Sequence, residues 1–493
     1  MGATKADITA LQSSTYDAWL TTQFATPRAT KFYDWLLAKG FGDIQYKNGT
    51  DGYNSLVWGQ VISGTDQLRQ RVGNALLNIL VVSINGLMGT SFQQFAQAAY
   101  MDVLWDGAFG NYRDLLDKIS TNTAMAVYLT FMGNQKANVA RGSQPDENYS
   151  RELMQLFTLG LYKLNADGTV QTANGKPVET YTPDDVSGLA RVFTGFTYDP
   201  VFDFQSPNGH QKPLVQNASI HETGVKTFLG TTIPAGTDGF ASLKIALDTI
   251  FAHPNVPPFV SKQLIQRLVT SNPSPAYVGR ISAIFANNGS GVRGDLKAVI
   301  RAILLDDEAR SDAGLTNPSF GKLREPVIRL TNWARAFGVT SATDVWNFGD
   351  TSSTSNRLGQ SIGRSPSVFN FFRPGYTPPN SAIASSNLVG PEFQITSEPS
   401  VIAYVNYMQS LIQTGAGDAK GNYTEILTKA SDSQALVDEI NLVLAAGQLS
   451  AATVTTIKTA VDSISFTGTN GPINRVYLAI LLVMAAPEYI TQK

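Results

Sequence analysis

The chain has 493 residues, of which 43% are apolar and only 15% are charged, below the ~25% charged residues of an average protein. There are 37 Lys and Arg residues against 39 Asp and Glu residues, and the formal net charge is -2. Such a balance gives no electrostatic footprint for nucleic acid or for an anionic membrane, so we predict no nucleic-acid partner.

Cysteine is absent and only three histidines occur, which excludes disulfides, thiolate nucleophiles and metal sites rich in Cys or His. We therefore predict no bound transition metal and no cofactor. Calcium is a separate case, because it prefers carboxylate and carbonyl oxygens, and the composition leaves it open.

Helical periodicity starts early and recurs along most of the chain. In residues 65–83, "TDQLRQRVGNALLNILVVS", Leu68, Val72 and Leu76 fall on one helical face. Strand patterns are few. We predict a mainly α fold, a large multi-helical body over residues 1–493 treated as a single helical domain with one small β-hairpin excursion.

Residues 145–164, "PDENYSRELMQLFTLGLYKL", place several charges in a segment that otherwise reads as a core helix. Ser143 is the predicted cap, with Asp146 in the first turn. Glu147 and Arg151 are four residues apart in the favourable acid-first order. Glu152 points well away from Glu147 around the helix, so these two carboxylates do not form a catalytic pair by themselves.

Residues 165–235 carry the β signal of the chain. The stretch "GTVQTANGKPVETY" alternates around Asn174-Gly175, the pair typical of a tight hairpin turn. We expect a β-hairpin and irregular insertion over residues 165–235, with a further short strand beginning near Lys226.

Within that insertion, residues 182–195 predict a second helix. Thr182 caps it, Pro183 occupies the first helical position and Asp185 closes a capping box. Arg191 then needs an acidic partner. We expect Arg151 to pair with Glu147, or with an acid of this helix, in a buried place; the alternative reading of all these charges is purely structural.

Histidines offer the other candidate chemistry. His221-Glu222 and His253 could supply a general acid or base, or each histidine could be structural. Adjacent residues of a strand point to opposite sides. In a turn, however, His221 and Glu222 could both converge on Glu147 or Asp185.

Two later segments complete the pass along the chain. Asn255 is a candidate cap for a helix with a Val260, Leu264, Leu268 stripe. Residues 341–395 form a long irregular loop rich in aromatic and Arg residues, including "GRSPSVFNFFRPGYTPP". Rings with fixed arginines could line a sugar-binding cleft, or the rings could simply be buried.

No apolar run is long enough for a membrane span. The longest, residues 476–486, falls short of the ~20 residues that a spanning helix needs.

Six ordered stretches resemble the bacterial "domain of unknown function 1800" family: "ENYSRELMQLFTLGL", "YTPDDVSGLARVFTGF", "HETGVKTFLG", "HPNVPPFVSKQLIQRLVTSNPSPAYV", "GDLKAVIRAILLDDEAR" and "RSPSVFNFFRPGY". The resemblance covers nearly the whole chain. Relatives usually begin with an export signal and a segment ending in Phe-Gly-Ala-Thr, whereas this chain opens at Met-Gly-Ala-Thr. The resemblance implies a periplasmic or secreted protein, with a sulfatase-like protein from a neighbouring gene as a possible partner, and supplies no reaction.

Two functional hypotheses follow. The first is an exported protein whose polar cleft binds or hydrolyses an envelope or extracellular polymer, such as a polysaccharide. The second is a non-catalytic assembly or binding protein in which the same residues are structural. Under the first, the predicted catalytic residues are Glu147, Asp185 and His221, and the predicted binding residues are Arg151, Glu152, Arg191, Glu222, His253, Phe371, Arg373 and Tyr376.

Overall fold

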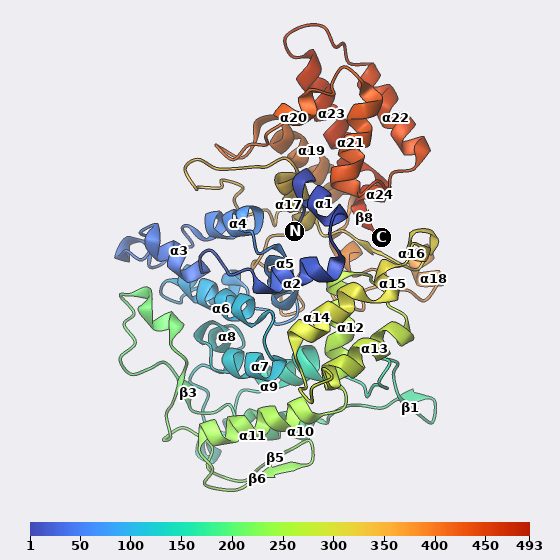
Figure 1. The fold of residues 1–493 in the computed structure, drawn as a ribbon. Helices are drawn as coiled ribbons and strands as arrows, with labels where there is room; N and C mark the ends of the chain where they lie inside the picture. Colours follow the sequence, from blue (N-terminus) through green and yellow to red (C-terminus); the bar gives the residue numbers. More distant parts are fainter.

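The computed structural model describes residues 1–493 and confirms the predicted fold class. It is 51% helical, with 24 α-helices and only small two-stranded sheets. In Figure 1 the helices from α19 onward gather at one end of the molecule, and α10, α11 and the β5–β6 hairpin lie at the opposite end. Both chain termini lie between these two ends (Figure 1).

The helices of the first part of the chain are α1 (Lys5–Gln12), α2 (Tyr16–Ala25), α3 (Phe32–Ala38), α4 (Tyr53–Ser63), α5 (Gln67–Leu77), α6 (Gln93–Gly107), α7 (Tyr112–Ser120), α8 (Thr123–Tyr128), α9 (Asn148–Glu152) and α10 (Pro183–Ala190). Those of the middle are α11 (Gly239–Ala252), α12 (Val256–Leu268), α13 (Pro275–Ala286), α14 (Leu296–Leu305), α15 (Asp307–Arg310), α16 (Ala313–Thr316) and α17 (Pro326–Ala336). Those of the last part are α18 (Ala382–Ser385), α19 (Glu398–Thr414), α20 (Thr424–Leu427), α21 (Ser433–Ala445), α22 (Ala451–Asp462), α23 (Gly471–Ala485) and α24 (Pro487–Ile490).

Shorter helical turns are η1 (Ile44–Tyr46), η2 (Ile84–Leu87), η3 (Val139–Arg141), η5 (Pro207–Gln211) and η6 (Pro391–Ile395). A π-helix, η4 (Leu153–Thr158), continues directly from α9. The sequence predicts one continuous helix here, whereas the structure has a single α-turn followed by a wider one.

Four antiparallel pairs make up all the sheet structure: β1 (Thr172–Ala173) with β2 (Lys176–Pro177), β3 (Phe196–Thr197) with β4 (Val215–Gln216), β5 (Lys226–Phe228) with β6 (Thr231–Ile233), and β7 (Lys322–Leu323) with β8 (Thr491–Gln492). The first three pairs lie within residues 165–235. The turn between β1 and β2 has positive φ at Asn174 and Gly175, as the sequence predicts.

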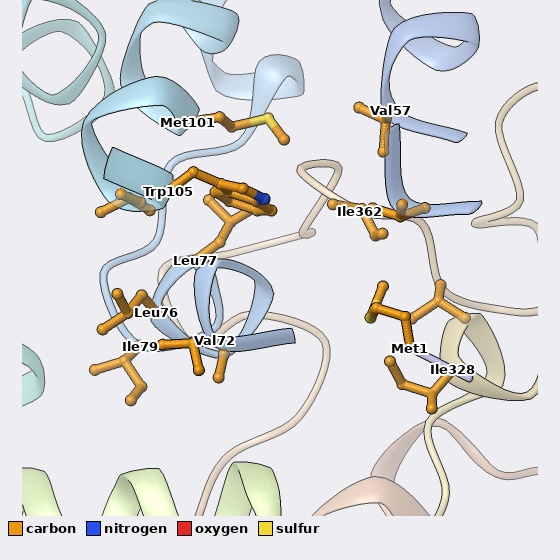
Figure 2. Close-up of a cluster of buried hydrophobic side chains, with 14 of the residues drawn as sticks. Met1, Val57, Val72, Leu76, Leu77, Ile79, Met101, Trp105, Ile328 and Ile362 are labelled. Carbon is orange, nitrogen blue, oxygen red and sulfur yellow. The ribbon is translucent and has the colours of Figure 1, made fainter. Parts of the chain in front are cut away.

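One contiguous cluster of 108 buried hydrophobic residues runs through the molecule. Figure 2 shows part of it, in which Ile362 of the irregular 341–395 segment lies near Val57 of α4, and the same cluster includes Val72 of α5 and Ile328 of α17. The irregular segment is therefore built into the core rather than laid over the surface. No helix combines the length and the apolar character needed to cross a bilayer.

A buried ion cluster joins parts of the chain that are distant in sequence. Lys322 Nζ lies 2.8 Å from Glu392 Oε1 and 3.9 Å from Glu325 Oε1, and all three side chains are at most 1% exposed. Arg71 of α5 approaches Glu325 to 3.7 Å, and Gln360 Nε2 donates to Glu325 Oε2 at 2.8 Å. Burial raises the pKa of Glu325, but Lys322, Arg71 and Arg267 outweigh it and hold that pKa below its ordinary value.

Replacing Glu325 with Gln should lower the free energy of unfolding by roughly 3–5 kcal/mol, because it leaves an excess of buried positive charge. Denaturant unfolding of the full chain measures this. Glu425→Gln is the control: Glu425 pairs with Lys5 at 2.9 Å, but its side chain is 75% exposed, and the loss should stay below about 1 kcal/mol. Equal losses in the two variants would contradict a stabilising role for the buried cluster.

His210 predicts a specific pH dependence of stability. The residue is 1% exposed, its Nε2 donates to the Ser91 carbonyl at 2.7 Å, and burial lowers its pKa from 6.5 to about 4. The unfolded chain then binds a proton that the folded chain does not, so stability is complete above pH 6.5 and falls by about 3 kcal/mol towards pH 4. Urea unfolding measures the free energy of unfolding of the parent and of His210→Gln between pH 6.5 and pH 4. The difference between the two proteins isolates the effect of His210. Parallel curves would refute it.

Candidate functional site

Helix α12 forms the floor of a large cleft. Successive residues at helical spacing face the cleft: Phe259, Lys262, Gln263, Gln266 and Arg267. The apolar residues Val260, Leu264 and Leu268 are buried on the remaining face, as their spacing predicts. One face of α12 thus holds the helix in the core and the other presents polar groups to the cleft.

The first wall begins within η4 and runs over residues 155–170. Asn255 Nδ2 donates to the carbonyls of Leu159 and Tyr162 at 2.9 and 2.8 Å, and Asn255 Oδ1 accepts from the Leu164 N–H at 3.0 Å. Asn255 occupies the predicted cap position of α12, but its side chain forms no capping hydrogen bond, because these bonds to the wall use it. Its role is to fasten an irregular wall to the start of the floor helix.

The second wall consists of residues 368–377 and 387–394 of the irregular segment. Asn272 forms two 2.9 Å bonds with the backbone of Val389, one through Nδ2 and one through Oδ1. Gln266 Nε2 donates to the Pro374 carbonyl at 3.4 Å, which ties the floor to this wall. Side-chain amides therefore provide the bonds that a sheet would otherwise supply.

The cleft between these walls has a volume of about 1130 Å³ and is lined by 30 residues. Four aromatic rings line it: Tyr162, Phe259, Phe369 and Tyr376. Seven carboxamide side chains and three cations line it as well, and none of the lining residues is Asp, Glu or His. Gln263 and Gln266 use only their Nε2 groups in bonds to the protein, which leaves both carbonyl oxygens to a ligand.

The structure brings some of the predicted binding residues to this cleft. Arg373 and Tyr376 line it, and the Arg373 guanidinium lies 4.5 Å from the centre of the Phe369 ring. Phe371 lines instead a separate small cavity. The remaining predicted site residues do not line the cleft.

Glu147 links two helices at the surface. Its Oε2 accepts from Arg151 at 3.0 Å, and its Oε1 accepts from Ser187 Oγ of α10. The pairing is as predicted, but the predicted burial is wrong, because the Arg151 and Glu147 side chains are 46% and 38% exposed. The predicted cap is also wrong: α9 begins at Asn148, whose N–H donates to Asp146 Oδ1, and Ser143 lies outside it.

Other predicted charges near this helix pair are bonded or buried. Asp185 closes the predicted capping box with Thr182 and also accepts from the Leu229 N–H. Burial raises the pKa of Asp185, but these N–H donors outweigh it and hold the pKa below its ordinary value. Burial raises the pKa of Glu152. The predicted acidic partner of Arg191 is absent: this exposed side chain donates instead to the Val225 carbonyl.

The histidines bond backbone rather than carboxylates. His221 Nδ1 donates to the Thr194 carbonyl at 2.7 Å, and burial lowers its pKa. Glu222 Oε1 accepts from the Gly224 N–H, so the turn does not direct both side chains to one acid–base pair. His253 Nδ1 accepts from the Asn255 N–H at 3.1 Å, and burial lowers the pKa of His253. This geometry is the one expected of structural histidines.

No group of three or more His, Cys, Asp or Glu side chains is arranged to hold a metal ion. The expectation that the chain works without a cofactor stays a prediction.

With this geometry established, comparison with known proteins identifies one family. The family model described as "Protein of unknown function (DUF1800)" matches residues 1–491. The chain belongs to this family. Comparison with curated proteins and with solved structures gives no match. The resemblance noted in the sequence is thereby confirmed over nearly the full length, and the DUF1800 description assigns no reaction.

Two groups of residues at or under the cleft were missed by sequence reasoning. The polar face of α12 had a readable signal, since Phe259, Lys262, Gln263 and Gln266 recur at helical spacing opposite the apolar stripe. The ion cluster beneath it had none, because Lys322 and Glu392 are far apart in sequence and only the fold brings them together.

Replacing Arg151 with Ala should cost no more than about 0.5 kcal/mol of unfolding free energy, because the pair with Glu147 is exposed to solvent. Arg28→Ala is the matched control, since Arg28 pairs with Asp102 at 2.7 Å with both side chains nearly buried, and should cost roughly 3–5 kcal/mol. Thermal or urea unfolding distinguishes the two. A loss of several kcal/mol in Arg151→Ala would contradict the exposed pair and support the buried pairing that the sequence predicts.

Proposed function

We propose that the cleft binds an extended polysaccharide chain, in keeping with the exported, periplasmic or secreted location that the family resemblance implies. The observation that carries the proposal is the combination of four rings with seven carboxamides on the two walls and the floor. Aromatic faces pack on the apolar faces of sugar rings, and amides bond sugar hydroxyls through both donor and acceptor atoms.

The size of the cleft favours a polymer over a single small molecule. Its volume of about 1130 Å³ exceeds the ~300–1,000 Å³ of pockets that enclose drug-sized ligands. Leu161, Tyr162 and Val170 are exposed on the first wall, where they offer further apolar surface to a bound chain.

The lining favours binding over hydrolysis. Most glycosidases place two carboxyl groups on either side of the scissile bond, and general acid–base work elsewhere commonly uses His, Asp or Glu. Those residue types do not line this cleft, and Glu147, Asp185 and His221 lie outside it. We therefore propose a binding protein rather than a hydrolase, and assign no catalytic residue.

Tyr376→Ala should weaken binding of a polysaccharide ligand about tenfold, since one stacked ring contributes about 1–1.5 kcal/mol. The Tyr376 side chain forms no hydrogen bond with the protein, so stability should hardly change. Binding is measured by calorimetry and by retardation in gels containing a panel of soluble neutral and acidic polysaccharides.

Tyr16→Ala is the matched control, because Tyr16 is an exposed ring with Arg310 stacked 4.1 Å from its centre, outside the cleft. This variant should bind like the parent. Failure of every polysaccharide to bind, or equal affinity in all three proteins, would refute the proposal. If the parent releases new reducing ends from a polysaccharide, the protein is a hydrolase, and the proposal that it only binds the polymer is wrong.

A further inference from the structure

Arg267 is a buried cation without a partner. It lies in the last turn of α12, is 3% exposed and lines the floor of the cleft. Its guanidinium stacks 4.6 Å from the centre of the Phe372 ring, but forms no ion pair and donates no hydrogen bond to the protein. A guanidinium has five N–H donors, and those of Arg267 are left to solvent or to a ligand in the cleft.

The neighbouring acids are committed to other groups. Glu392 pairs with Lys322, and Glu325 bonds Gln360 and lies near Arg71. Glu325 and Glu392 attract Arg267 without contacting it, while burial lowers the pKa of Arg267. The carboxylates of Glu325 and Glu392 thus balance only two of the three cations Lys322, Arg71 and Arg267. The unbalanced positive charge is that of Arg267, which faces the cleft.

The other two cations of the lining add to this charge. Lys262 lies on the floor and Arg373 on the second wall, and neither side chain forms an ion pair or a hydrogen bond with the protein. Asp167, beside the first wall, attracts Lys262 only from a distance. All three cations therefore remain unpaired in a cleft that no carboxylate lines.

We propose that Arg267 receives an oxyanion of the ligand, so that the polymer bound in this cleft is an acidic polysaccharide carrying carboxylate or sulfate groups. This inference rests on the proposed polysaccharide binding and narrows it to one chemical class. The planar guanidinium can bind either oxyanion through two parallel N–H bonds, while Lys262 and Arg373 attract further charges along the chain.

The test compares polymers that share a backbone and differ in charge. Polygalacturonate against its fully methyl-esterified form tests carboxylate, and dextran sulfate against dextran tests sulfate. The parent should bind at least one charged form about tenfold more tightly than its neutral counterpart, in proportion to a charge-assisted bidentate contact. The pair that shows the larger ratio identifies the oxyanion.

Arg267→Gln should remove most of this ratio, because only Lys262 and Arg373 then attract the charged polymer. Arg357→Gln is the control: it removes the same charge from a guanidinium that stacks 4.8 Å from the Tyr407 ring at a separate hollow, and should keep the full ratio. If Arg267→Gln does not fold, Lys262→Gln takes its place in the test. This variant should lower the ratio of charged-polymer to neutral-polymer affinity about threefold at low salt, because one nearby positive charge is lost.

Each result has a separate meaning. Equal binding of charged and neutral polymers by the parent overturns this inference and leaves polysaccharide binding intact. An unchanged ratio in Arg267→Gln, or in Lys262→Gln where that variant decides, also overturns it. Failure of every polysaccharide overturns the proposed function and this inference together. Tighter binding of single-stranded DNA than of any acidic polysaccharide overturns the assignment of the polymer.

Discussion

The position of the cleft depends on a single ammonium group. Lys322 Nζ donates to the carbonyls of Gln266 and Arg267 at 2.9 and 3.0 Å, at the end of α12 where helical carbonyls lack partners. The same group pairs with Glu392 of η6, and Glu325 immediately precedes α17. A positive charge at this end of a helix is favourable, and the acids that balance it come from the irregular wall segment and from the residue that precedes α17. Floor, wall and core are thereby fixed relative to one another.

The low charge of the chain and the amides around the cleft have a structural explanation in this arrangement. Long irregular segments have backbone groups that neither a helix nor a sheet can satisfy. Asn255 and Asn272 supply the missing partners for the two walls, while Gln360 serves both the Val327 N–H and the buried Glu325. Neutral amides do this without the desolvation that a charged side chain would require.

Local rules predicted local structure well. The Thr182 capping box, the Asn174-Gly175 turn and the apolar stripe of α12 depend on residues a few positions apart, and each forms as the spacing indicates. The Glu147–Arg151 pair also forms, but its exposure depends on which distant segments cover α9, and sequence spacing carries no such information. Sequence spacing likewise could not show that Glu147, Asp185 and His221 lie outside the cleft. The cleft is lined instead by the polar face of α12, which the apolar stripe alone did not reveal.

The pairing of β8 with β7 has a consequence for how the protein is made. Gln492 Nε2 donates to the carbonyl of Leu268 at the end of α12, across 224 residues of sequence, and β8 holds the strand that begins at Lys322. During translation, Gln492 is added long after α12 has left the ribosome, and domains fold as their segments are synthesised. The end of the floor helix therefore acquires its last bonds only when synthesis has passed Gln492.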